Sequence, residues 1–141
     1  MKLIDLIFRM NYTLLQGSLE QDITEVIYDS RKAVPGCIFL CLPGAVTDGH
    51  KYIPDVLEKG AVALVVEHDV KVPEHITVLK VDNSRVALAE LAAAWYGHPA
   101  EKLTTIGVTG TKGKTTTTYM IRGILEKAGL PTGLIGTIEA I

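Results

Sequence analysis

The sequence has no marked excess of charge of either sign. Its 141 residues contain 14 Lys and Arg against 16 Asp and Glu, which gives a formal net charge of -2. A protein that binds nucleic acid or an anionic membrane through a broad surface needs a strongly basic patch, so this balance argues against both kinds of partner. Any anionic ligand must be held locally, by a few groups at one site.

The sequence also lacks a long hydrophobic run. No charge-free apolar stretch reaches the roughly 18 residues that a membrane-spanning helix requires. The apolar start of the chain is interrupted by Asp5 and Arg9, and no cleavage site of small residues follows, so a signal peptide is not indicated. We therefore expect a cytoplasmic protein with no membrane partner.

Cysteine is scarce, because Cys37 and Cys41 are the only two in the chain. Both lie in the apolar run Cys-Ile-Phe-Leu-Cys-Leu, where the alternation of a strand would point them to the same face as Phe39. A metal site would need further Cys or His residues nearby at ligand spacing. We interpret both cysteines as buried free thiols.

The composition is that of a globular protein, with 48% hydrophobic and 21% charged residues. Along the chain, the sequence pattern predicts strands that alternate with helices. The sequence predicts strands, separated by Gly and Pro turns, at residues 25–28, 37–42, 61–66 and 76–81. It predicts helices, each ended by a glycine, at residues 52–59 and 84–96. The near-continuous apolar strands are typical of a sheet covered on both faces. The expected fold class is therefore α/β, with a small Rossmann-like domain at residues 1–98.

The helix predicted at residues 84–96 has an apolar stripe whose members fall at i, i+3, i+4 and i+7, namely Leu88, Leu91, Ala92 and Trp95. Asn83 or Ser84 can cap its start. Gly97 can end it in a left-handed conformation, and Pro99 prevents its continuation. We interpret residues 98–103 as a solvated linker between two domains.

Beyond the linker, the sequence predicts one strand-helix-strand unit, with strands at residues 104–108 and 133–138 and a helix at residues 115–128. The apolar stripe of this helix consists of Ile121, Ile124, Leu125 and Ala128. Gly129 and Pro131 end the helix. We expect residues 99–141 to begin a second domain and to leave an apolar strand edge exposed.

A glycine-rich segment joins the first of these strands to the helix. Its residues are Gly110, Thr111, Lys112, Gly113, Lys114, Thr115 and Thr116, and a strand-to-helix turn is the context that a phosphate-binding loop requires. Glycines let successive backbone N–H groups point inward, and the helix N-terminus adds partial positive charge. In this interpretation Lys114 reaches the β- and γ-phosphates, and Thr115 offers a hydroxyl to Mg²⁺.

The spacing is shorter than in the general pattern G-x-x-x-x-G-K-[ST], whose first glycine would fall on Val108. The pattern here is G-x-x-G-K-T, beginning at Gly110. This shorter spacing restricts the protein families to which the loop can belong, and it keeps the residue types that bind phosphate. Four threonines, residues 115–118, open the helix although β-branched residues are mediocre helix formers. We interpret their hydroxyls as facing a ligand. The alternative is a glycine-rich turn that binds nothing.

Residues 108–117, Val-Thr-Gly-Thr-Lys-Gly-Lys-Thr-Thr-Thr, closely resemble the ATP loop of the Mur ligases of peptidoglycan synthesis, whose relatives include folylpolyglutamate synthase. The N-terminal part resembles the same family through Asp29-Ser30-Arg31, Pro43-Gly44 and Asp48-Gly49-His50, in a domain that folylpolyglutamate synthases lack. Within the family, residues 133–138 are more similar to the enzyme that adds the third peptide residue. The resemblance covers essentially the whole chain.

The resemblance implies a cytoplasmic ATP-dependent amide ligase, a monomer at full length, that joins a diamino acid, lysine or meso-diaminopimelate, to UDP-MurNAc-L-Ala-D-Glu through an acyl phosphate. It implies ATP and Mg²⁺, with residues 110–116 as the ATP site, Lys114 as a catalytic residue and Thr115 as a metal ligand. Carried over by position, Ser30 contacts the UDP portion of the precursor, with Tyr28 as a second candidate.

The remaining polar loops are given simpler interpretations. The loop at residues 45–50 is expected near the nucleotide, with Asp48, Gly49 and His50 shaping the turn before the next helix. His68, His75 and His98 lie in polar connecting segments and are interpreted as surface histidines.

In the family, the ATP domain continues with an acidic Mg²⁺ ligand, a His ligand and a carbamylated lysine, and a third domain follows; none of these occurs here. We therefore expect a fragment that binds nucleotide weakly and does not catalyse ligation alone. The alternatives are a non-catalytic module that binds the UDP-MurNAc-peptide, the Mur ligase that adds D-Ala-D-Ala, and an unrelated phosphate-loop switch or kinase. The last would need an acidic strand or switch segment that the sequence does not show.

Overall fold

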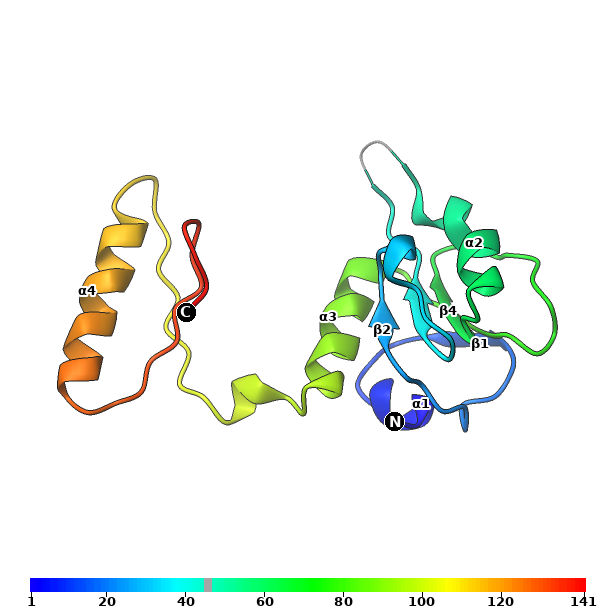
Figure 1. The fold of residues 1–141 in the computed structure, drawn as a ribbon, viewed down its shortest axis with the longest axis horizontal. Coiled ribbons are helices and arrows are strands. Elements are labelled where there is room, and N and C mark those ends of the chain that lie inside the picture. The colour runs from blue at the N-terminus through cyan, green and yellow to red at the C-terminus, as the bar shows by residue number, and fades with distance from the viewer. Residues whose placement is uncertain (45–46) are drawn as a thin grey trace. The chain divides into compact units, whose positions relative to one another are not determined.

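The structure is a computed structural model that describes residues 1–44 and 47–141. Ala45 and Val46, which belong to the loop expected near the nucleotide, lie outside the described residues. Two compact units make up the chain, Met1–Lys102 and Leu103–Ile141 (Figure 1). Among the described helices, none combines the length and the hydropathy that crossing a membrane requires.

The first unit is built on one five-stranded sheet in the order β1-β5-β4-β3-β2. Its strands are β1 (Thr13–Gln16), β2 (Val26–Ile27), β3 (Ile38–Leu40), β4 (Ala63–Val66) and β5 (Thr77–Lys80). The strands β2 to β5 are parallel, and β1 pairs antiparallel with β5 at the edge. The four parallel strands coincide with the predicted ones, although each is shorter than predicted, and the α/β fold class is confirmed.

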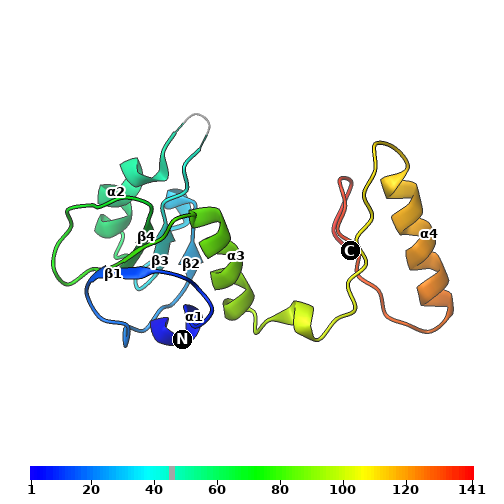
Figure 2. The same ribbon diagram turned by 180° about the vertical axis from the view of Figure 1, so that it is seen from behind.

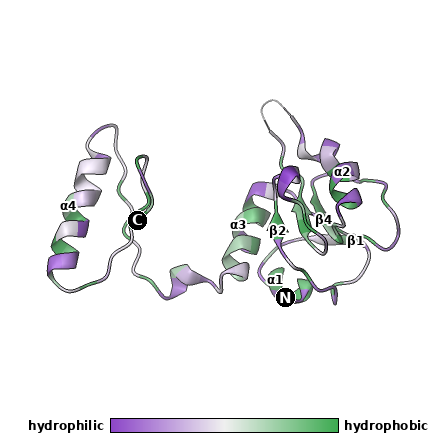
Figure 3. Ribbon diagram, viewed as in Figure 1, coloured by the Kyte–Doolittle hydropathy of each residue, from purple (hydrophilic) through white to green (hydrophobic). Residues whose placement is uncertain are grey.

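Both faces of this sheet are buried. Along β4, Ala63 and Val65 belong to one core, and Leu64 and Val66 belong to the other. The first core packs against α1 (Leu3–Leu6) and α3 (Ser84–Trp95), and the second lies under α2 (Ile53–Glu58). Figures 1 and 2 show α3 and α2 on opposite sides of the sheet, and Figure 3 shows the central strands as hydrophobic. Each fully buried aliphatic side chain contributes about 1.5–3 kcal/mol, so this double layer stabilises the unit.

The two cysteines lie in the second core. Cys37 and Cys41 are fully buried on the same face of the sheet as Phe39. Both are free thiols. Burial raises the pKa of Cys41 to about 12 and shifts the pKa of Cys37 in the same direction. The prediction of buried free thiols is confirmed.

Helix α3 is capped at both ends. The Asn83 side chain accepts hydrogen bonds from two backbone N–H groups of the first turn, as predicted. At the other end Gly97 has a φ of +72°, a left-handed conformation that favours glycine. The N–H groups of Gly97 and His98 donate to carbonyls of the last turn, which is the Schellman pattern. Within the predicted stripe, Leu91 is fully buried, while Leu88 and Trp95 pack against the core.

Two elements at the start of the chain were not predicted, α1 and β1. The sequence of β1, Thr-Leu-Leu-Gln, does not alternate apolar and polar residues, so no pattern in the sequence indicated this strand. Its side chains are mostly exposed. Its pairing with β5 shifts register between Leu14 and Gln16, which is a β-bulge.

The segment predicted as a solvated linker contains a short 3-10 helix, η3 (Pro99–Glu101). The Glu101 carboxylate forms an ion pair with the Arg9 guanidinium, which lowers the pKa of Glu101. Glu101 is exposed, as predicted for a solvated segment, but its ion pair attaches it to the N-terminal part of the first unit.

The second unit contains one helix, α4 (Lys114–Lys127), which matches the predicted helix closely. The strands predicted at residues 104–108 and 133–138 do not form. Instead Leu134 and Ile141 exchange two backbone hydrogen bonds around an isolated antiparallel bridge between Ile135 and Ala140. A strand requires hydrogen bonds to a neighbour, and the described residues of this unit supply no such neighbour for either segment. Without a sheet to cover, Ile124 of the predicted stripe stays 67% exposed.

Candidate functional site

The glycine-rich segment of the second unit is exposed and leads directly into α4. Gly113 precedes the helix with a φ of +77°, which favours glycine at this position. The helix begins at Lys114, so the N–H groups of its first turn have no acceptor within the helix. These donors, together with the helix dipole, favour an anion at this end. The backbone can therefore receive a phosphate group.

The Lys114 side chain is folded back over this segment. Its Nζ donates a hydrogen bond of 2.6 Å to the carbonyl oxygen of Gly110. Phosphate oxygens are stronger acceptors for an ammonium group than a neutral carbonyl is. An incoming phosphate can therefore replace Gly110 as the acceptor while the charge stays over the loop.

The four threonines at the start of α4 divide into two pairs. The Thr117 hydroxyl donates to the Gly113 carbonyl, and the Thr118 hydroxyl donates to the Thr115 carbonyl, both at 2.8 Å. The interpretation that all four hydroxyls face a ligand is therefore wrong for these two, which bond back to the helix. The Thr115 and Thr116 hydroxyls make no hydrogen bond to the described part of the chain, so they can contact a ligand.

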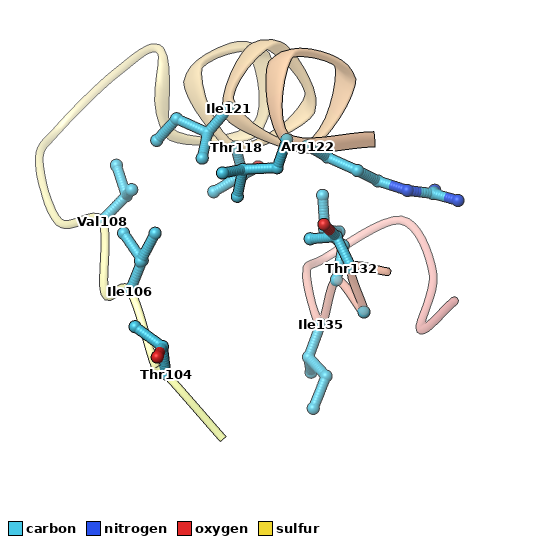
Figure 4. Close-up of a pocket in the computed structure, with 11 residues that line it drawn as sticks. Thr104, Ile106, Val108, Thr118, Ile121, Arg122, Thr132 and Ile135 are labelled. Carbon is cyan, nitrogen blue, oxygen red and sulfur yellow. The ribbon is translucent and has the colours of Figure 1, made fainter. Parts of the chain in front are cut away.

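A small cavity of about 130 Å³ lies between α4 and the segments that flank it (Figure 4). Its lining is mainly aliphatic, and Figure 4 shows Ile121 of α4 opposite Ile106 and Val108. None of residues 110–116 lines it. Ligand pockets usually occupy about 300–1,000 Å³. We therefore interpret this cavity as a packing space of the helix and not as the nucleotide site.

In the first unit, an open groove of about 480 Å³ lies where β2 and β3 end. The carboxyl ends of parallel strands meet at one edge of a sheet, which is where α/β proteins commonly bind ligands. The groove is lined by Tyr28, Asp29, Ser30, Arg31, Leu42, Thr47, Gly49 and Tyr52. It brings together both precursor-site candidates, Tyr28 and Ser30. Thr47 belongs to the loop that was expected near the nucleotide, whereas sequence reasoning missed Tyr52, because only the topology places it beside the β2 loop.

The turn that carries Ser30 is held on two sides. Asp29 caps the short helix η1 (Ser30–Lys32), and its carboxylate binds the Arg31 guanidinium through hydrogen bonds of 2.9 and 2.7 Å. The side-chain bonds from Arg31, followed by its backbone N–H, lower the pKa of Asp29 to about 2. On the other side, Lys59 Nζ donates to the Ser30 carbonyl oxygen at 2.9 Å. The Ser30 hydroxyl is thus presented on a fixed backbone.

A histidine cluster that the sequence did not predict adjoins the groove, formed by Asp48, His50 and His68. The Asp48 carboxylate caps η2 (Gly49–Tyr52) by accepting the His50 N–H, so the interpretation of Asp48 as a turn-shaping residue is confirmed. His50 does more than shape the turn, because its side chain is only 8% exposed and its Nδ1 lies 2.5 Å from Asp48 Oδ1. Hydrogen bonds from the His50 backbone and ring lower the pKa of Asp48.

The second histidine of the cluster covers the first. The His68 ring stacks on the His50 ring with 3.8 Å between centroids and 23° between planes. His68 is largely exposed, as predicted for a surface histidine, but one face of its ring is used in this contact. No local pattern could reveal the pair, since the two residues lie in separate connections of the fold.

Two family models match the chain. The description "Mur ligase family, catalytic domain" matches residues 22–96, and "Mur ligase middle domain" matches residues 108–141. The first match covers the groove and the histidine cluster, and the second covers the glycine-rich segment and α4.

Among curated proteins, the UDP-N-acetylmuramoyl-L-alanyl-D-glutamate--2,6-diaminopimelate ligase of Clostridium perfringens is 46% identical over 129 residues, which is 92% of this chain and 27% of the relative. The chain thus spans about a quarter of the length of this relative. Among solved structures, MurF from Acinetobacter baumannii is 31% identical over 89% of this chain and 27% of its own, with a TM-score of 0.70. MurF ligase from Thermotoga maritima, in complex with ADP, is 28% identical over 76% of this chain and 24% of its own, with a TM-score of 0.54.

Proposed function

Because the chain belongs to the Mur ligase family, we propose that it is part of an ATP-dependent ligase that adds a diamino acid to UDP-MurNAc-L-Ala-D-Glu. The observation that carries this proposal is the exposed glycine-rich segment, in which the left-handed Gly113 precedes α4 and the Lys114 side chain folds back to Gly110. The similarity to a 2,6-diaminopimelate ligase supports diaminopimelate as the added amino acid. Synthesis of such a precursor is a cytoplasmic reaction in this proposal.

We assign the two substrates to different parts of the chain. Residues 1–98 hold the UDP end of the precursor, with Ser30 and Tyr28 in the groove at the ends of β2 and β3. Residues 99–141 begin the ATP-binding domain, with residues 110–116 as the phosphate loop. The similar MurF ligase is in complex with ADP, which supports an adenine nucleotide as a ligand of this chain.

In the reaction, the D-glutamyl carboxylate attacks the γ-phosphorus of ATP, the bond to the β,γ-bridging oxygen breaks, and ADP leaves. The amine of the diamino acid then attacks the acyl phosphate, losing a proton and releasing phosphate as the amide forms. Phosphoryl transfer depends mainly on positioning and on neutralising charge. Lys114 and the first N–H groups of α4 supply that charge stabilisation at the phosphates.

The chain also offers an oxygen donor to a magnesium ion. The Thr115 hydroxyl stands at the start of α4 and makes no hydrogen bond with the described protein groups, and hydroxyl oxygen is a ligand that Mg²⁺ accepts. When bound, Mg²⁺ neutralises the phosphate oxygens during transfer. Lys114 would then hold the phosphates and Thr115 the metal ion, from adjacent positions on the helix.

Two variants separate this proposal from a non-catalytic binding module. Lys114→Ala removes a charge-assisted hydrogen bond of roughly 1.5–3 kcal/mol, so the affinity for Mg-ATP should fall about ten- to hundredfold. The same variant should leave the affinity for UDP-MurNAc-L-Ala-D-Glu unchanged. Ser30→Ala should lower the affinity for UDP-MurNAc-L-Ala-D-Glu and leave the affinity for Mg-ATP unchanged. Isothermal titration calorimetry of this chain measures both ligands, and Lys127→Ala, at the other end of α4, is the matched control.

The opposite outcomes are equally informative. Unchanged Mg-ATP binding in Lys114→Ala would contradict the phosphate-loop assignment. Precursor binding without any Mg-ATP binding in the unmodified chain would favour the binding module, for which the two-sided core of the first unit is the supporting observation.

A further inference from the structure

His50 lies at a junction between the groove and the rigid part of the first unit. Its Nε2 accepts a hydrogen bond of 3.2 Å from the backbone N–H of Glu67, the residue that follows β4. A ring nitrogen that accepts an N–H carries no proton, so this contact assigns the proton of the neutral ring to Nδ1. Nδ1 therefore donates to Asp48 Oδ1 at 2.5 Å. One ring connects two segments that are 17 residues apart.

On the groove side, Asp48 belongs to the segment that forms one wall. Thr47 and Gly49, its two neighbours, both line the groove. The Gly49 N–H donates to the Leu42 carbonyl at 2.9 Å, and Asp48 forms an isolated bridge with Pro43. The wall is therefore attached to the end of β3 by the backbone. Among the described residues, its side-chain contacts to the end of β4 are the hydrogen bond of the His50 ring with Glu67 and a longer contact of 3.9 Å between Asp48 Oδ2 and His68 Nε2.

Glu67, which donates its backbone N–H to the His50 ring, is itself held in place by α3. The Glu67 carboxylate accepts hydrogen bonds of 2.7 Å from both the backbone N–H and the hydroxyl of Ser84, the first residue of α3. These bonds lower the pKa of Glu67. Because β4 and α3 belong to the buried core, the Glu67 N–H is a rigid point from which the groove wall can be held.

The same residues do not have the arrangement of a metal site, although donor atoms of Asp48, His50 and His68 lie within 4.8 Å of one another. Both ring nitrogens of His50 are already used in hydrogen bonds. The two rings are stacked nearly parallel, so the in-plane lone pairs of their nitrogens do not converge on one point. The contacts fit a hydrogen-bonded support, in which His68 shields His50 from water.

We propose that His50 is a positioning residue for the groove: it holds the wall formed by Thr47 and Gly49, through Asp48, at a fixed distance from the end of β4. The inference rests on the proposed function, because it takes the UDP-MurNAc-peptide as the occupant of the groove. His50 does not itself line the groove; its ring acts on the lining residues through the Asp48 side chain and the adjoining backbone.

Two substitutions separate the two hydrogen bonds. In His50→Asn the amide nitrogen can replace Nδ1 as the donor to Asp48, but the acceptor for Glu67 is lost. In His50→Gln the amide oxygen can replace Nε2 as the acceptor for Glu67, but the donor to Asp48 is lost. Both should lower the affinity for UDP-MurNAc-L-Ala-D-Glu by about tenfold, which corresponds to one hydrogen bond. The Mg-ATP affinity should not change in either variant. His75→Asn, at an exposed histidine, is the control.

Amide hydrogen exchange gives a readout that does not depend on the ligand. The Glu67 amide should exchange faster in His50→Asn only, whereas the Gly49 amide should exchange faster in both variants. Precursor affinity equal to that of the unmodified chain in both variants would overturn the proposal. If the unmodified chain does not bind the precursor, the proposed function fails, and the exchange pattern still decides whether His50 holds the wall. If both variants unfold, His68→Ala, which uncovers the His50 ring and removes the 3.9 Å contact with Asp48, must lower the affinity for the precursor several-fold for the proposal to stand.

Discussion

Among single residues, Asp29 has its protonation state set by a neighbour in the groove, Arg31. Its carboxylate accepts three hydrogen bonds from Arg31, and these keep it ionised at nearly any pH. The Arg31 side chain is mostly exposed, so a positive charge is held at the groove beside Ser30. An anionic ligand there meets an Arg31 guanidinium whose position is fixed by Asp29 and whose charge is partly balanced by that carboxylate.

The pKa of Asp29 can be measured directly. It is lowered from 3.8 to about 2 in the folded chain, so the stabilisation from this group is fully present above the unfolded value of 3.8. That stabilisation is lost as the pH falls through about 2. A carboxyl carbon NMR titration should give a midpoint near 2, and Arg31→Met should raise it toward 3.8. Lys32→Met, which removes only a minor neighbouring charge, should change it little. A midpoint that stays near 2 in Arg31→Met would refute the ion pair.

A local pattern singled out the glycine-rich segment at residues 110–116, and the family resemblance pointed to Ser30; each lies within one short stretch of the chain, and both site assignments stay predictions. Local patterns could not predict that Thr117 and Thr118 bond back to the helix, since that depends on side-chain rotamers. They could not predict the contact of His50 with Glu67 either. That contact exists only because the fold brings the ends of β3 and β4 together.

Among the elements, α3 is the one whose ends are most fully determined by sequence. Asn83 satisfies N–H groups at the start, and Gly97 makes the turn at the end. The strands illustrate the opposite case. Within the strand predicted at residues 61–66, Ala63–Val66 form β4 because β3 and β5 lie on either side. Residues 104–108 have a similar β-branched composition, but no strand of the described second unit pairs with them, and composition alone did not make a strand.

The cap of α3 makes a quantitative test. Asn83→Ala leaves two N–H groups of the first turn without their acceptor, so the free energy of unfolding should fall by about 1 kcal/mol. Asn83→Asp keeps an acceptor oxygen at the same place and should retain most of the stability. Urea unfolding monitored by circular dichroism measures both. Equal stability of the Ala variant and the unmodified chain would show that the cap contributes nothing.

Across the whole molecule, burial is distributed unevenly. Of the described hydrophobic residues with less than about a tenth of their surface exposed, Leu134 is the only one in the second unit. The first unit has two cores, one on each face of its sheet. Since burial of apolar surface is the main source of stability, the two units should differ strongly in resistance to local opening.

Hydrogen exchange tests this difference on the intact chain. The amides of β3 and β4 should exchange slowest, because they open only when the first unit unfolds. The amides of α4 should exchange much faster at the same pH, since the helix has no fully buried side chain. Mass spectrometry of peptic fragments resolves the two regions. Equal protection of α4 and β4 would mean that the second unit has a source of stability beyond the burial described.

The bulge in β1 has a consequence for how the protein behaves when concentrated. An edge strand normally offers a row of unpaired N–H and C=O groups on which a second copy can build a continuous ladder. Between Leu14 and Gln16 the register shifts, so the spacing of those groups on the outer side is interrupted. A growing β-aggregate would have to start on an irregular template at this edge, which gives the fold a built-in resistance to that route of self-association.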